Sequence, residues 1–251
     1  MKTKQLRGER TMGKQSKYSW AIFNVTFVIL LFGVVFLFAG CGGGGGGSSH
    51  KSTPTTYKLY PDGYFTAGTQ ESYNLTGSNT NGGLYTGTLV LETQSATTFN
   101  SAQAIPVDDE LSLTNTVNST TFTLTAVEYF STDSNLELLG YHSDQFVGDA
   151  TPGTSSLSVI PQTASIGDSG SVGTYTFSNG DILTITWKLT QASGSNANLV
   201  MSTTATTSTG TTLLTEENSF VIDQDGNRQS VLIVLNAVSK GISLTVSGDK
   251  S

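Results

Sequence analysis

Apolar and polar residues alternate along several stretches of the chain beyond residue 56. The clearest alternation runs over residues 181–190, where every second position is apolar: Leu183, Ile185, Trp187 and Leu189. Because successive side chains of a β-strand point to opposite faces, this pattern predicts a strand with one buried face. Similar alternation predicts strands at residues 86–93, 121–129 and 242–246.

Residues 230–237 differ, because they are apolar at every position from Val231 to Leu235. Such a run indicates a central strand that is covered on both faces. Clusters of Gly, Asn, Asp and Ser predict turns between the strands, at residues 78–83, 131–135, 178–181, 192–198 and 223–227. Short strands at this spacing predict an all-β fold, built as an antiparallel meander, a sandwich or a half-barrel. Helix is expected at most as a short segment within residues 101–112.

Two parts of the chain share a similar order of residues. Residues 73–94 contain an aromatic residue, a polar turn and a strand pattern in the same sequence as residues 175–191. A Pro-, Ser- and Gly-rich stretch separates them. We interpret residues 57–251 as one β-rich domain with a single core, in which residues 57–150 and 165–251 are two related halves. Chance similarity between Thr- and Gly-rich stretches is the alternative.

The N-terminus has the features of an export signal. Residues 1–19 contain six Lys and Arg residues and one acid, and residues 20–38 are almost wholly apolar. A basic segment, an apolar segment and then small residues are typical of a secretory signal peptide. The apolar run ends in Ala39-Gly40-Cys41, which resembles the lipobox of bacterial lipoproteins. An uncleaved membrane anchor is the alternative, because about 19 apolar residues can just span a bilayer.

The resemblance to bacterial lipoproteins implies a diacylglycerol group on the Cys41 sulfur and cleavage between Gly40 and Cys41. Phe38 departs from the aliphatic residue that is usual at its position in this motif. Residues 1–40 are then a signal peptide. Residues 41–56 are a lipidated cysteine with a Gly- and Ser-rich tether, a composition typical of flexible linkers.

The same resemblance implies a location in the bacterial cell envelope. Gly42 follows the cysteine, and in Gram-negative lipoproteins the absence of Asp at this position implies the outer membrane. Met12 opens a shorter signal of the same kind, so the natural start is either Met1 or Met12.

Composition and charge exclude several functional classes. Residues 1–40 hold six of the 12 basic residues and one of the 19 acidic ones, so the remaining chain carries a formal charge of about −12. Such a surface is repelled by the phosphates of DNA and RNA, and no nucleic-acid partner is expected. One Cys excludes an intrachain disulfide framework, and two His residues leave too few ligands for a Cys- or His-based metal site.

Two motifs are candidates for catalysis. Gly167-Asp168-Ser169-Gly170 matches the nucleophile stretch of trypsin-like proteases, but that chemistry needs a His base, and the domain's one His is His142. A polar turn is the favoured interpretation. Asp108, Asp109 and Glu110 could supply paired carboxylates, although adjacent acids usually point to different sides and stay solvated. We therefore predict no catalytic residue and no enzymatic activity.

Asp223, Asp225 and Asn227 resemble the start of a calcium-binding loop, because oxygen ligands alternate there. The bidentate Glu of an EF-hand would fall at position 234, which is Val234. The stretch is equally typical of a hairpin turn. It is kept as a calcium candidate, and no other metal and no cofactor is predicted.

Aromatic residues crowd the start of the domain: Tyr57, Tyr60, Tyr64, Phe65, Tyr73 and Tyr85. Aromatic side chains with few charges suit sugar stacking or a lipid groove, and they equally suit packing between strands. No ligand-binding residue is assigned from the sequence.

These observations favour a lipid-anchored envelope lipoprotein that acts as a non-enzymatic structural or binding module. Its expected partners are the membrane, through the lipid anchor, and an envelope protein, glycan or lipid. Residues 161–170 are similar to the Pro…Gly-Asp-Ser loops of uncharacterised envelope lipoproteins, some of which have half-barrel folds similar to lipoprotein carriers. That resemblance implies an alternative, a carrier of lipid or another apolar ligand. A secreted hydrolase is the third hypothesis.

Overall fold

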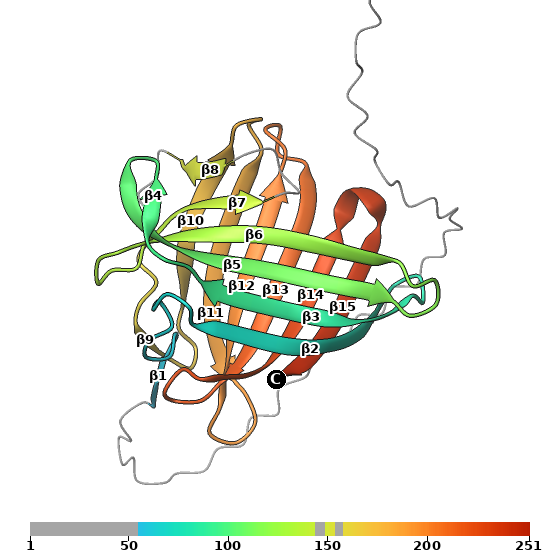
Figure 1. Ribbon diagram of the computed structural model, residues 1–251, viewed down its shortest axis with the longest axis horizontal. Coiled ribbons are helices and arrows are strands. Elements are labelled where there is room, and N and C mark those ends of the chain that lie inside the picture. Colours follow the sequence, from blue (N-terminus) through green and yellow to red (C-terminus); the bar gives the residue numbers. More distant parts are fainter. Residues whose placement is uncertain (1–54, 144–148, 154–157) are drawn as a thin grey trace, which may run out of the picture. The chain divides into compact units, whose positions relative to one another are not determined.

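The computed structural model describes residues 55–143, 149–153 and 158–251 (Figure 1). The predicted signal peptide, Cys41 and nearly all of the predicted tether lie outside the described residues. The described part is built from strands, with one 3-10 turn at Val238–Lys240, so the all-β prediction is confirmed. Among these residues, no helix has the length and apolar character needed to cross a membrane.

Fifteen strands follow one another along the described part of the chain. The first eight are β1 (Thr56–Lys58), β2 (Gln70–Asn79), β3 (Leu84–Thr93), β4 (Thr97–Phe99), β5 (Ala102–Asn115), β6 (Thr121–Ser131), β7 (Leu138–Ser143) and β8 (Asp149–Pro152). The others are β9 (Thr163–Ser165), β10 (Ser169–Phe177), β11 (Ile182–Gln191), β12 (Ala197–Thr206), β13 (Thr212–Ile222), β14 (Arg228–Ala237) and β15 (Ile242–Lys250). Every predicted turn cluster falls at a junction between consecutive strands.

Twelve of these strands close into one antiparallel barrel. Hydrogen-bonded neighbours follow the order β3-β2-β15-β14-β13-β12-β11-β10-β8-β7-β6-β5, and β5 returns to β3 through pairs from Tyr85–Asn115 to Thr93–Val107. β4 pairs with the first part of β5 outside this ring, and β1 pairs with β9 in a separate small sheet. The antiparallel connections agree with the predicted meander, and the β3–β5 pairing makes the sheet a closed barrel in place of a sandwich or half-barrel.

The barrel buries one face of each long strand. The apolar positions predicted to share one side of β11 are all buried, between 0% and 6% exposed: Leu183, Ile185, Trp187 and Leu189. Their cross-strand partners on β12 include Leu199 and Ala205, which are also buried. On the other face of β11, Thr186 and Lys188 are exposed. Burial of each large apolar side chain contributes roughly 1.5–3 kcal/mol, so the inward face is the main source of stability.

Two sequence predictions about strands are wrong. Residues 230–237 do form a strand, β14, but its outer face is open, and Leu232 is 41% exposed while Val231 is 2% exposed. The outer side of a barrel strand has no second layer above it, so an apolar run does not require two covered faces. The short helix considered for residues 101–112 is instead part of β5, which pairs with β3, β4 and β6.

The two suggested halves each supply six neighbouring strands of the barrel. The first half supplies β2, β3 and β5–β8, and the second supplies β10–β15. The similar residues 73–79 and 175–180 begin in β2 and β10, which are the first barrel strands of each set. This placement agrees with a relation between the halves, which stays a prediction.

Glycines allow close contact between backbones where β15, β2 and β3 meet. Gly248 and Gly87 lie opposite Leu75 from either side. A Cβ atom added at Gly87 would overlap the carbonyl oxygen of Ser112 on β5, and one added at Gly248 would overlap that of Asn74 on β2. Glycine at such positions lets barrel strands bend sharply.

We therefore expect Gly87→Ala to lower the free energy of unfolding by roughly 1–3 kcal/mol, because the added methyl group must displace backbone. Denaturant titration followed by far-ultraviolet circular dichroism measures this. Thr86→Ala, on the exposed face of the same strand, is the matched control and should change stability little. Equal stability of the two variants would contradict the assigned close contact.

Candidate functional site

Residues 57–68, which we call the covering segment, lie over one end of the barrel. Hydrogen bonds join it to four separate positions on the rim: Tyr57–Ser195, Lys58–Gln224, Leu59–Gln162 and Gly68–Thr93. Leu59 is completely buried, and Tyr57 is 3% exposed. The segment is therefore a fixed part of this end, and its aromatic residues are held in place from several sides.

A buried arginine contacts the inner side of this segment. Nη1 of Arg228, at the start of β14, donates to the Tyr64 hydroxyl at 3.1 Å and to Glu71 Oε2 at 3.3 Å. The other oxygen of Glu71 accepts from Lys250 Nζ at 2.7 Å. The Arg228 and Glu71 side chains are only 4% and 3% exposed. The ion pair is thus enclosed by protein.

Aromatic rings surround the guanidinium group of Arg228. Its Cζ atom lies 4.2 Å from the ring centroid of Phe220, 4.7 Å from that of Tyr64 and 5.5 Å from that of Tyr60. The negative face of an aromatic ring attracts a cation at these distances. Arg228 therefore links the barrel interior to the rings of the covering segment.

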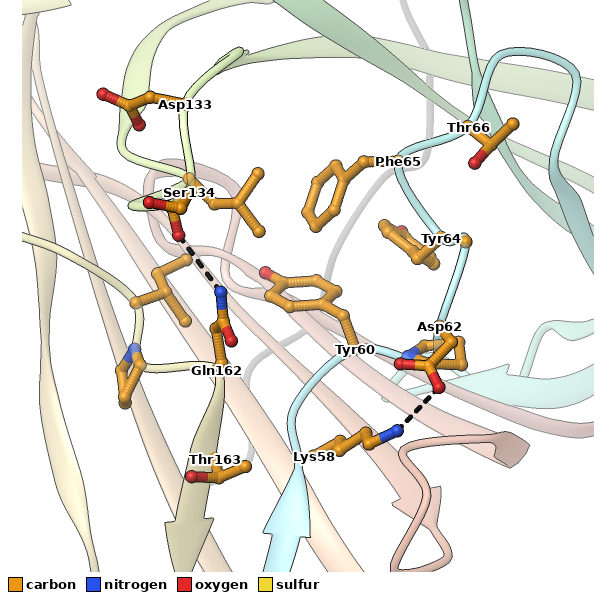
Figure 2. A pocket seen from close by; sticks show the side chains of 15 residues that line it. Lys58, Tyr60, Asp62, Tyr64, Phe65, Thr66, Asp133, Ser134, Gln162 and Thr163 are labelled. Atoms are coloured by element: carbon orange, nitrogen blue, oxygen red, sulfur yellow. Dashed lines mark hydrogen bonds and ion pairs between the residues drawn. The ribbon is translucent and has the colours of Figure 1, made fainter.

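A cleft of about 430 Å³ opens at this end (Figure 2). Its lining comes from residues 58–66 on one side and from residues 133–136 and 160–163 on the other. Tyr60 and Phe65 lie in its middle with their ring centroids 5.0 Å apart, and both are partly exposed. The volume falls within the ~300–1,000 Å³ that is usual for small-molecule sites.

The rim of the cleft carries amide, hydroxyl and carboxylate groups. Gln162 Nε2 donates to the Ser134 carbonyl at 3.2 Å, which joins the two segments of the wall opposite Tyr60 (Figure 2). At the other edge, Lys58 Nζ lies 2.7 Å from Asp62 Oδ2. Asp133 accepts hydrogen bonds from the Ser131 hydroxyl and from backbone N–H groups, which lower the pKa of its carboxyl group.

The two tyrosines of the cleft stay protonated at neutral pH. Burial raises the pKa of the Tyr60 phenol far above its usual value. Burial also raises the pKa of Tyr64 to about 12, although the nearby Arg228 opposes this shift. Both hydroxyls are thus neutral groups, able to donate and to accept hydrogen bonds.

A second, much smaller void of about 60 Å³ lies inside the barrel, and acidic groups line it. Asp109 on β5 and Glu216 on β13 line it. Glu128 on β6 lies near them, since the negative charges of Glu128 and Glu216 both raise the pKa of Asp109. Burial raises the pKa of all three carboxyl groups, that of Glu128 to about 7. In the described part of the chain, no cluster of His, Cys, Asp or Glu side chains is arranged to hold a metal ion.

These buried acids predict that stability falls as the pH rises. The pKa of Glu128 is raised from its usual value of 4.5 to about 7, so the folded state binds its proton more tightly than the unfolded state. The Glu128 carboxyl alone should lower the free energy of unfolding by roughly 3 kcal/mol between about pH 4.5 and pH 7. Glu128→Gln should remove part of this slope in denaturant titrations at several pH values, and the exposed Glu110→Gln should leave it intact. An unchanged slope in Glu128→Gln would count against the shift.

The residues of the protease-like motif are not brought together with a histidine. Ser169 begins β10 and lies opposite Lys188 on β11. His142 on β7 pairs with Asp149, at 2.8 Å from its Oδ1 atom, close to the other end of the barrel. The two positions are roughly 25 Å apart along the strands. Asp168 accepts from the Ser165 N–H, as a polar turn requires.

The calcium candidate lies in the turn between β13 and β14, and the acidic run lies on β5. Oδ1 of Asp223 accepts from the N–H groups of Asp225 and Asn227, and its Oδ2 accepts from the Asn227 side chain. This pattern is typical of a hairpin turn, and the calcium candidate formed by these three residues stays untested. Asp109 lines the inner void, whereas Glu110, the next residue, is exposed, as expected for neighbours on a strand.

The predicted aromatic group divides among three places, and Tyr57 lies buried in β1, which pairs with β9. Tyr60, Tyr64 and Phe65 lie at the cleft, and Tyr73 and Tyr85 are buried among the strands. Sequence reasoning missed Arg228, which contacts the cleft tyrosines, and Gln162 in the opposite wall, because both lie far from residues 58–66 in the chain. Comparison of the chain with protein-family models, with curated proteins and with solved structures finds no match.

Proposed function

We propose that this chain is a non-enzymatic binding module, held in the bacterial cell envelope by a lipid on Cys41, with its ligand site in the end cleft. The observation that carries the proposal is the cleft itself. It combines partly exposed rings with polar groups from two other segments, and the hydrogen bonds around residues 57–68 hold it open in advance. A preformed concave site of this kind costs little to order on binding.

The position of the cleft agrees with a tethered module. Residues 58–66 follow directly on the predicted tether, whose residues 42–56 could extend over at most ~50 Å. A ligand site in this place lies close, along the chain, to the proposed anchor. Such a module would sample ligands near the membrane surface to which it is fastened.

The alternative function, a carrier with an apolar ligand inside the barrel, has less support. The void inside the barrel is about 60 Å³, and large side chains such as Tyr73 and Tyr175 fill the rest of the interior. That space suits a few water molecules and not an acyl chain. The end cleft is the larger of the two sites.

We expect small molecules to bind in the cleft and to be displaced by a bulky side chain there. Full-length protein in detergent micelles is screened against a fragment library by saturation-transfer NMR. Thr163→Trp, which fills the cleft, should abolish binding, and Thr86→Trp on the outer barrel face should not. A library that yields no fragment sensitive to Thr163→Trp would contradict the proposed site.

A further inference from the structure

The exposed rings of the cleft provide a stacking surface for a ligand. Tyr60 and Phe65 are tilted by 58° to each other, and Phe65 also packs on Phe130 at 5.0 Å between centroids. These contacts fix both ring planes, so a flat apolar face of a ligand would meet a rigid partner. Rigid aromatic side chains supply contact area at small entropic cost.

A cationic ligand is disfavoured at these rings. Arg228 already lies against Tyr60 and Tyr64, with its Cζ atom 5.5 Å and 4.7 Å from their centroids. Glu71 balances this positive charge only in part, because Lys250 shares the same carboxylate, so a second cation on the cleft side would be repelled across a single ring. The rings that could attract a cation are therefore already in contact with the Arg228 guanidinium group.

An anionic ligand is disfavoured by the rim. Among the described residues that line the cleft, Lys58 is the one cation, and it is paired with Asp62 at 2.7 Å. Asp133 adds a second carboxylate, which its hydrogen bonds keep ionised. A phosphate or carboxylate would thus meet more negative than positive charge, on a chain that is acidic as a whole.

A purely apolar ligand would also be a poor fit. It would keep water away from the exposed Gln162 amide and Thr163 hydroxyl without replacing the hydrogen bonds that water gives them, at a cost of about 1–3 kcal/mol for each group. A ligand that fits has apolar faces for the rings, many hydroxyl groups for the rim and no net charge. Sugars combine these properties, because C–H groups cover the faces of the ring and hydroxyls surround it.

We infer that the end cleft binds a neutral saccharide, which stacks on Phe65 and Tyr60 and exchanges hydrogen bonds with Gln162. The inference rests on the proposed function and specifies the ligand class of the same site. A glycan of the cell envelope carries these groups, and so does a free oligosaccharide.

The test uses full-length protein in a detergent without a sugar head group. Cellobiose, maltose and lactose serve as neutral probes in saturation-transfer NMR and titration. Glucose is then compared with glucosamine and glucuronate at equal concentration. We expect binding of at least one disaccharide, and weaker binding of both charged sugars than of glucose. Absence of binding by all three disaccharides, or preference for a charged sugar, would overturn the inference.

Variants separate stacking from apolar contact. Phe65→Leu keeps an apolar side chain but removes the ring, and should weaken disaccharide binding about tenfold, whereas Phe65→Trp should retain it. Tyr129→Leu removes one ring of the stacked Phe99–Tyr129 pair elsewhere and is the matched control. Gln162→Ala, outside the aromatic cluster, gives a second measurement should Phe65→Leu unfold. Unchanged affinity in Gln162→Ala and in a folded Phe65→Leu would refute the stacking site.

The result is distinguishable from failure of the proposed function. Library fragments that bind the cleft and are lost in Thr163→Trp, with no binding of the disaccharides, would leave a binding module and remove the saccharide. If the ligand is a free oligosaccharide, the protein should bind the soluble disaccharides and should not be retained by cell-wall glycan. Retention of the protein by isolated, delipidated cell-wall glycan, with competition by the bound disaccharide, would identify an envelope glycan as its source.

Discussion

Replacing Arg228 by Met lowers the free energy of unfolding by about 3 kcal/mol, because it leaves the buried carboxylate of Glu71 without its buried cationic partner. The substitution keeps most of the side-chain volume, so the loss is chiefly electrostatic. Glu71 is 3% exposed and would keep the Tyr73 hydroxyl, which donates to its Oε2 at 3.2 Å, and Lys250, which is 36% exposed. The contacts of the guanidinium with Phe220, Tyr64 and Tyr60 are lost as well. Denaturant titration monitored by the fluorescence of Trp187, which is 6% exposed, measures the change.

A matched control distinguishes this effect from the loss of any positive charge. Lys188 pairs with Glu217 at 3.7 Å on the outer face, where both side chains are nearly half exposed. Lys188→Met should therefore cost less than about 1 kcal/mol. The double variant Arg228→Met with Glu71→Gln should recover part of the loss, since the buried charge is gone. If Arg228→Met is as stable as Lys188→Met, the buried Arg228–Glu71 pair does not stabilise this end of the barrel.

The strands could be predicted from the sequence, but the closure of the barrel could not. Alternation located β11 and β6 almost to the residue, because one buried and one solvated face impose a period of two. It could not distinguish an open sheet from a closed one, because every strand has one apolar face in both. Closure depends on the pairing of β3 with β5 past the intervening β4, which no local pattern encodes. The outer face of β14 was misjudged for a related reason, since an apolar residue such as Leu232 does not reveal what covers it.

The candidate site was predictable only in part. The crowding of aromatic residues between Tyr57 and Phe65 does mark the covering segment, and three of them reach the cleft. Their partners are distant in sequence, with Arg228 164 residues from Tyr64. Asp109 was expected to be solvated like its neighbours, but its inward position on β5 buries it. A single charge in a strand says little about its face unless the register is known.

The largest expected effect in cells concerns Cys41, which lies outside the described residues. Cys41→Ser should abolish lipid attachment and processing, because the thiol is the acceptor of the lipid in the lipoprotein family that the signal resembles. Metabolic labelling with a radioactive fatty acid should mark the wild-type protein and not the variant. On gels the variant should run as the precursor that retains residues 1–40. Ser48→Ala, in the tether, is the control and should be labelled and processed normally.

Detergent partition alone would not decide this prediction, because an unprocessed precursor keeps the apolar residues 20–38 and also enters detergent. The decisive comparison therefore combines acylation with size. Two or three acyl chains, at about 0.8 kcal/mol for each buried CH₂ group, hold a protein firmly once residues 1–40 are removed. An uncleaved anchor predicts instead that wild-type and Cys41→Ser proteins have equal size and that neither takes up label. That outcome would remove the lipid anchor from the proposed function, while the end cleft and its ligand tests would be unaffected.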